Sequence, residues 1–264
     1  MKRSIPSSMK FKSDRYQCGF TLMETVIAIL VLAVLLTGFL TVFTPAAQGI
    51  RRSISTQQAD RLKATLEKDM TTLRVGETIT GVLSPTGFDK AFTWIKEGNA
   101  ANKAIFVYQY RANKSGSLRT DGTLPPMNVI SGKPGEDYII QTAARRVRDL
   151  IGGQNYFNAD LEAIVGPLFY VIPTQLVYKN NELVLGTPGK VFNPIVPPAT
   201  TPVEATTPAL YTDAVITFSA AFYSVPSVSP NYINGSKFTE KFNAAAASGS
   251  KVKPVFIRNL AVRR

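Results

Sequence analysis

The hydrophobic pattern of the chain is dominated by one long apolar run near the N-terminus. From Thr25 to Phe43 the sequence reads TVIAILVLAVLLTGFLTVF, nineteen residues without a charged side chain. About 20 apolar residues in an α-helix cross the roughly 30 Å hydrocarbon core of a bilayer. A secretory signal peptide has a shorter apolar region that ends in a small-residue cleavage site, whereas this run continues into a polar helical segment. The pattern therefore predicts a transmembrane helix that stays with the mature protein.

After Pro45 the pattern becomes amphipathic, because apolar residues recur at helical spacing among charged and polar ones. These residues are Ile50, Ile54, Leu62, Leu66 and Leu73. Val75 and Gly76 are a suitable place for this helix to end. We therefore expect a helix of 55 residues from Phe20 to Arg74, roughly 80 Å long, with residues 20–44 in the membrane and 45–74 as an amphipathic continuation. Gly38 and Pro45 are the places where we expect this helix to bend or locally melt.

Residues 75–264 form a head in which helical and strand patterns are mixed. The clearest helical pattern is Glu136 to Ile151, ended by Gly152 and Gly153. Its apolar face would contain Ile139, Ile140, Ala143, Val147 and Leu150. A second, short helix is expected from Asp160 to Val165, with Asn158 as its capping residue.

Several short segments have the composition and alternation of β-strands. They are Ile105–Arg111, Phe169–Ile172, Leu176–Tyr178, Leu183–Leu185, Val215–Val225 and Val255–Val262. Asn180 and Asn181 suit a hairpin turn between the third and fourth of them. These strands favour an antiparallel sheet that the N-terminal helix covers on one face, which is an α+β fold.

Two segments of the head have the composition of connections. Residues 187–209 are rich in Pro and Thr and predict an exposed excursion. A plain insertion is favoured for this loop over an O-glycosylated or partner-binding one. The run AAAASGS from Ala244 to Ser250 predicts a flexible connection, and Asn234-Gly235 predicts a tight turn.

The residues in front of the apolar run are more specific than the run itself. A basic, polar leader of residues 1–19 ends in Cys18-Gly19, and Phe20-Thr21-Leu22-Met23-Glu24 opens the apolar stretch. This GFTLxE string resembles the class III signal of type IV prepilins and pseudopilins. The resemblance implies that a membrane prepilin peptidase cleaves after Gly19 and methylates the new N-terminal Phe20. It also implies a pilin-like head on a long N-terminal helix.

Glu24 is the acidic residue at the entrance of the apolar run. A carboxylate deep in a bilayer costs up to ~2.5 to 3.5 kcal/mol, and such residues usually have a partner. The resemblance implies that Glu24 meets the free N-terminal amine of an adjacent subunit and sets the axial register of a filament. The alternative is an acid that reaches the membrane interface without a specific partner.

The formal net charge of the chain is +12, but this excess of positive charge does not by itself predict a nucleic-acid partner. The leader holds a net +4, and the remaining +8 is spread, with small clusters at 51–52, 145–148 and 258–264. No aromatic residues alternate with these clusters, so a solvated basic surface is expected and nucleic-acid binding is not. Basic residues flank the apolar run on both sides, so the difference in positive charge between its two ends does not set its orientation in the membrane. Cleavage of the leader from the cytoplasmic side, as the resemblance implies, places the head on the other side of the inner membrane.

The residue types that carry most catalytic and metal chemistry are scarce. The chain has no histidine, and its single cysteine is Cys18, which removes imidazole catalysis, Cys/His metal sites and disulfides. A lipoprotein cysteine follows the apolar run, whereas Cys18 precedes it and would leave with the leader. Asn231, Asn234 and Glu240 are too widely spaced to predict a calcium site. We therefore expect no enzyme, no cofactor and no metal.

The size of the head favours a minor filament subunit. The stretch LEKDM at residues 66–70, followed by several strands, is similar to the J-type minor pseudopilins of type II secretion. The implied partners are the prepilin peptidase, other pilins or pseudopilins, the lipid bilayer and, indirectly, an assembly platform protein and an ATPase. Two alternatives stay open: a surface-binding protein or adhesin that uses the helix only as an anchor, and a tethered envelope enzyme.

Overall fold

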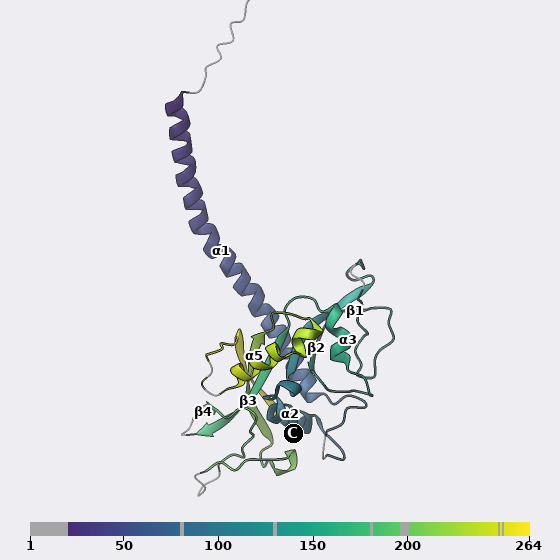
Figure 1. Ribbon diagram of the computed structural model, residues 1–264. Helices are drawn as coiled ribbons and strands as arrows, with labels where there is room; N and C mark the ends of the chain where they lie inside the picture. Colours follow the sequence, from purple (N-terminus) through teal and green to yellow (C-terminus); the bar gives the residue numbers. More distant parts are fainter. Residues whose placement is uncertain are drawn as a thin grey trace, which may run out of the picture. The chain divides into compact units, whose positions relative to one another are not determined.

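The computed structural model of the protein describes residues 21–79, 82–128, 131–179, 182–195, 201–247, 249 and 251–264. The chain divides into two units, Met1–Thr56 and Gln57–Arg264, which are considered separately below. Helix α1, Leu22–Thr71, begins in the first unit and ends in the second (Figure 1). It is helical through both Gly38 and Pro45, so the expectation of local melting there is wrong. A proline removes one hydrogen bond of a helix but does not oblige it to end.

The second unit adds the end of α1 to the head expected from the sequence, and from here on the head means Gln57–Arg264. It is built on a six-stranded antiparallel sheet (Figure 1). Its strands are β1 Ile105–Asn113, β2 Tyr138–Arg146, β3 Phe169–Lys179, β4 Glu182–Leu185, β5 Val215–Ser224 and β6 Phe256–Arg263. The order is β2-β1-β3-β5-β6, and β4 pairs with the far end of β3. The predicted α+β fold with an antiparallel sheet is therefore confirmed.

Helices cover both faces of this sheet. They are α2 Gly87–Glu97, α3 Tyr156–Asp160, α4 Pro230–Ile233 and α5 Ser236–Ala246, with the 3-10 turns η1 Ala101–Lys103, η2 Leu161–Ala163 and η3 Pro208–Leu210. The end of α1 and helix α2 pack on one face, and α3, η2, α4 and α5 pack on the other. Each face therefore has its own hydrophobic cluster.

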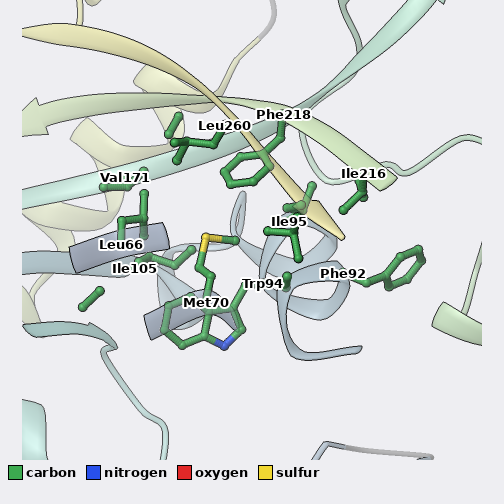
Figure 2. Packing of buried hydrophobic residues seen from close by; sticks show 14 of the residues in the cluster. Leu66, Met70, Phe92, Trp94, Ile95, Ile105, Val171, Ile216, Phe218 and Leu260 are labelled. Carbon is green, nitrogen blue, oxygen red and sulfur yellow. The ribbon is translucent and has the colours of Figure 1, made fainter. Parts of the chain in front are cut away.

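The first cluster joins α1 to the sheet. Leu62, Leu66 and Met70 recur on one side of α1 and are 2% exposed or less. They pack with Trp94 and Ile95 of α2 and with inward residues of the strands. Figure 2 shows Leu66 and Met70 in this cluster. Those strand residues include Ile105, Val171, Ile216, Phe218 and Leu260. The helical spacing seen in the sequence thus becomes the buried stripe of α1.

Polar contacts show that the sheet curls around this part of α1. At one edge of the sheet, Arg258 of β6 pairs with Asp60 at 3.5 Å. At the other edge, the Thr65 hydroxyl donates to the Thr142 hydroxyl of β2 at 2.8 Å. A flat sheet holds its outer strands several strand spacings apart. Both edges can meet one short stretch of helix only because the sheet is curled.

The second cluster is aromatic. Phe106 stacks on Phe157 with ring centroids 4.6 Å apart, and Tyr170 stacks on Tyr223 at 5.0 Å. Phe238 of α5 lies between these pairs, 5.3 Å from Phe106 and 5.6 Å from Tyr170. Offset and edge-to-face rings of this kind add specific geometry to the burial of apolar area.

The predicted helix in the middle of the head is wrong. The segment Glu136 to Ile151, expected to be a helix, contains β2, which pairs with β1 over nine residues from Ile105↔Arg146 to Asn113↔Tyr138. Ile139 and Ile140 are 40% and 48% exposed, so they are not the buried face of a helix. The partner strand β1 decided the conformation, because side-chain periodicity over a short segment fits either structure.

The remaining strands follow the predictions closely, with β3 as one strand where two were expected, continuing through Pro173. Asn180 and Asn181 lie outside the described residues.

The short helix near residue 160 begins earlier than expected, because the side chain of Asn155, and not that of Asn158, accepts from a backbone N–H of its first turn. Ala244 to Ala246 end α5 and do not form a flexible connection. Asn234 and Gly235 form the turn between α4 and α5.

The base of the Pro/Thr-rich segment 187–209 is part of the folded head. Val191 and Ala205 are fully buried in the first cluster, and the Ala205 N–H donates to the Val191 carbonyl at 2.8 Å. The side chain of Gln175 binds both the N–H and the carbonyl of Phe192. The expectation of a wholly exposed excursion is therefore wrong for these residues, and residues 196–200 lie outside the described part.

A buried network of charges replaces part of the basic surface expected from the sequence. Arg145 is 7% exposed and pairs with Asp121 at 2.5 Å and with Asp160 at 3.4 Å. Arg119 pairs with Asp160 at 2.8 Å, and the Tyr108 hydroxyl donates to the same carboxylate at 2.7 Å. The cluster at 145–148 is thus mostly structural, since buried charges are retained where partners are at hand.

Leu66 provides a direct test of the contact between α1 and the sheet. Because its side chain is fully buried, Leu66→Ala should lower the free energy of unfolding of the head by about 2–5 kcal/mol. Leu183→Ala, at a position that is 57% exposed, should change it by less than about 0.5 kcal/mol. Urea unfolding of the full chain in detergent micelles, followed by Trp94 fluorescence, measures both. Equal effects would show that α1 is not part of the core.

Asp121 generates a pH-dependent prediction. Burial alone would raise the pKa of its carboxyl, but Arg145 and the hydrogen bonds from Thr123 hold that pKa below 3.8. Because the folded pKa is lower than the unfolded one, the contribution of Asp121 to stability is present above about pH 4 and is lost as the pH falls through the folded pKa. Asp121→Asn should therefore reduce stability at neutral pH and flatten its decline in acid. Glu136→Gln, at an exposed ion pair, is the control, and an unchanged acid profile for Asp121→Asn would contradict the prediction.

Candidate functional site: the N-terminal helix

The first turn of α1 is organised by Thr21. The N–H of Glu24 donates to the Thr21 hydroxyl at 3.3 Å and to the Thr21 carbonyl at 3.0 Å. Thr21 and Glu24 stand in the Thr-x-x-Glu spacing of a capping box. The Glu24 N–H is one of the groups that have no acceptor four residues earlier at a helix start, and Thr21 supplies both of its acceptors.

This cap fixes where Glu24 lies. Its carboxylate belongs to the first turn of α1, where the partial positive charge of the helix N-terminus favours a negative group. Glu24 is exposed, and the structure of the single chain gives its carboxylate no ion-pair partner among the described residues. If Glu24 pairs with a positive group, that group lies outside the described part of the chain.

The segment that follows is apolar and exposed. Leu22–Thr41 has a mean hydropathy of 2.4 and is long and apolar enough to cross a membrane. Its large side chains are about half exposed or more, for example Leu30 at 60%, Leu35 at 66% and Phe39 at 55%. A surface of this kind in water would be strongly unfavourable. The segment therefore requires lipid or other apolar helices around it.

The threonines of the segment do not spoil its apolar character. The Thr25 hydroxyl donates to the Leu22 carbonyl at 2.8 Å. The hydroxyls of Thr37 and Thr41 donate to the carbonyls of Ala33 and Gly38, both at 2.7 Å. Because each hydroxyl has a partner within its own helix, none of the three presents an unsatisfied donor to hydrocarbon.

Of the site residues expected from the sequence, Glu24 lies in the described part of the chain. Gly19 and Phe20, the expected cleavage and methylation positions, lie outside it. The role of Thr21 as the helix cap is an addition from the structure, although the Thr-x-x-Glu spacing signals it in the sequence.

Comparison with known proteins bears on the same segment. Residues 14–40 match a family described as the prokaryotic N-terminal methylation motif. This motif is the signal of type IV prepilins and pseudopilins. It spans the end of the leader, the Gly19-Phe20 junction, Glu24 and most of the apolar segment.

The chain therefore carries the N-terminal signal of a type IV pilin-like or pseudopilin subunit on an apolar helix that is long enough to cross a membrane. The match does not extend into the head. No curated protein and no solved structure is significantly similar to the chain.

Proposed function

We propose that the protein is a minor subunit of a type IV pilus or a type II secretion pseudopilus. The prepilin peptidase cleaves it after Gly19 and methylates Phe20. Before assembly the subunit is a single-pass protein of the inner membrane. Its leader is cytoplasmic until cleavage, and its head is periplasmic. An ATPase and a platform protein act on the filament, and this chain contributes structure and not catalysis.

The observation that carries this proposal is the methylation motif at residues 14–40 on an exposed apolar helix. A helix that serves only as an anchor needs apolar side chains and no acid at its entrance. This helix has Glu24 in its first turn, held there by the Thr21 cap. In the proposed filament, Glu24 pairs with the N-terminal amine of Phe20 on an adjacent subunit.

The proposal of a minor position is supported by the head. Its sheet has six strands, and residues 187–195 and 201–209 add further chain to it, of which Val191 and Ala205 are buried in the core. Structure added beyond the sheet suits a subunit that makes contacts particular to one place in the filament. A subunit repeated along the whole length has no need of such additions.

Substitution of Glu24 tests the proposal. Glu24→Gln keeps the size of the side chain and its place in the first turn but removes the charge that pairs with an amine. We expect the variant to be cleaved and retained in membranes at wild-type levels, but to be reduced about tenfold or more in sheared filaments. Immunoblots of membrane and filament fractions with an antibody to the head give both numbers.

Glu24→Asp is the matched control, because it keeps the charge and should restore part of the assembly. Wild-type incorporation of Glu24→Gln into filaments would contradict the role of the charge. If the wild-type chain is cleaved but is never found in filaments, the protein is an anchored surface-binding protein and the assembly proposal is wrong.

A further inference from the structure

The two edges of the head sheet differ in whether their outward backbone groups have partners. At the β2 edge, the N–H of Ala144 donates to the Asp69 carboxylate of α1 at 2.8 Å. An acidic side chain therefore accepts a hydrogen bond from a backbone N–H that points out of the sheet. At the other edge, β6 ends the strand order, and no strand among the described residues pairs with its outer side.

The hydrogen-bond pattern identifies the groups on the open edge. The Arg264 N–H donates to the Ala214 carbonyl at 2.8 Å, and Arg263 stands opposite Val215. In an antiparallel pair, successive residues alternate between bonding to the partner strand and pointing away from it. The N–H and C=O groups of Arg263, Ala261 and Asn259 therefore point away from β5. All three residues are exposed.

The edge lacks most of the features that protect an open strand. The one it carries is a set of basic side chains, which disfavours pairing with another basic strand but not with an acidic one. β6 has eight residues, contains no proline and has no helix or loop paired to its outer side among the described residues. Natural proteins tend to shorten, bulge or cover such edges, because unpaired strands template further pairing. A strand of this length with open donors suits the addition of another strand.

The charges around the edge specify what kind of strand fits. Residues 251–264 contain five basic residues and no acidic one. They are Lys251, Lys253, Arg258, Arg263 and Arg264. In the described part of the chain, Arg258 pairs with Asp60, and the Arg264 guanidinium donates to the carbonyls of Pro208 and Tyr211. Lys251, Lys253 and Arg263 are therefore the members of the set that we expect to meet an added strand. A second copy of the same edge would bring like charges together, whereas a strand with acidic side chains would neutralise them.

We propose that the outer edge of β6 is a docking site for an extended, acidic segment of another protein, which adds to the sheet as a further strand. Backbone groups of Asn259, Ala261 and Arg263 bond to the added strand. The basic side chains around the edge select acidic residues on it. The cap of Ala144 by Asp69 on the β2 edge is an example within this molecule of a carboxylate meeting an open strand.

The probe is an end-capped peptide of about nine residues that alternates valine with glutamate, with a valine and lysine peptide of equal length as control. The full chain in detergent micelles should bind the acidic peptide at least about tenfold more tightly at low salt, and high salt should narrow the difference. Fluorescence anisotropy of the labelled peptides measures this affinity. Hydrogen exchange should slow at the amides of Asn259, Ala261 and Arg263, which is a readout that nonspecific attraction would not give.

Two pairs of variants separate the backbone from the charge. Ala261→Pro removes one outward N–H at an edge position where proline is tolerated, and should weaken binding about tenfold, whereas Ala261→Ser keeps the N–H and should bind normally. Arg263→Glu should weaken binding of the acidic peptide several-fold at low salt. Lys237→Glu, at an exposed position of α5, carries the same charge change and should have little effect.

Equal affinity for the acidic and basic peptides would overturn the proposal. So would normal binding by Arg263→Glu, or unchanged exchange at the three outward amides when the acidic peptide is bound. Dimers of the chain that protect the same amides without peptide would assign the edge to a second copy and would also overturn it. None of these results depends on cleavage after Gly19, so a failure here would leave the proposed function standing.

Discussion

The head depends on the burial of one stripe of α1 inside a curled sheet. Leu62, Leu66 and Met70 lose almost all contact with water there, and each fully buried side chain of this size contributes roughly 1.5–3 kcal/mol relative to exposure. The polar contacts of Asp60, Thr65 and Asp69 then hold both edges of the sheet to the same helix. The other elements of the head are arranged around this contact.

The same helix has two chemical surroundings along its length. Leu22–Thr41 exposes its apolar side chains and needs a membrane or neighbouring helices. Gln57–Thr71 has one apolar stripe, and the sheet of its own chain covers that stripe. In the proposed function, a subunit that moves from a membrane into a filament has to meet both requirements. Helix α1 meets them by a change of pattern and not by a break in the helix.

Local patterns in the sequence predict a large part of this structure. The alternation of Ile216, Phe218, Ala220 and Phe222 defines β5, because the sheet buries every second residue in the first cluster. Helix α2 also has a signal in the sequence, although this helix is not among the ones predicted above. Thr86 and Asp89 form a capping box, and Phe88, Phe92 and Ile95 repeat at helical spacing on its buried side.

Other features depend on contacts between distant parts of the chain. β2 is a strand because β1 pairs with it and Asp69 caps its edge, and neither partner is near it in sequence. The burial of Arg145 requires Asp121 and Asp160, which only the fold brings together. For the N-terminal site the order is reversed. The match to the methylation motif covers Gly19, Phe20 and Glu24, whose individual roles stay predictions, while the structure adds the Thr21 cap.

The central claim is that the chain enters the prepilin pathway, and the N-terminus of the protein in the membrane tests it most directly. Intact mass and N-terminal analysis should be made on protein extracted from membranes with and without the prepilin peptidase. The account predicts a mature chain that begins at N-methylated Phe20 when the peptidase is present, and an uncleaved chain when it is absent. A chain that keeps residues 1–19 under both conditions would contradict the account.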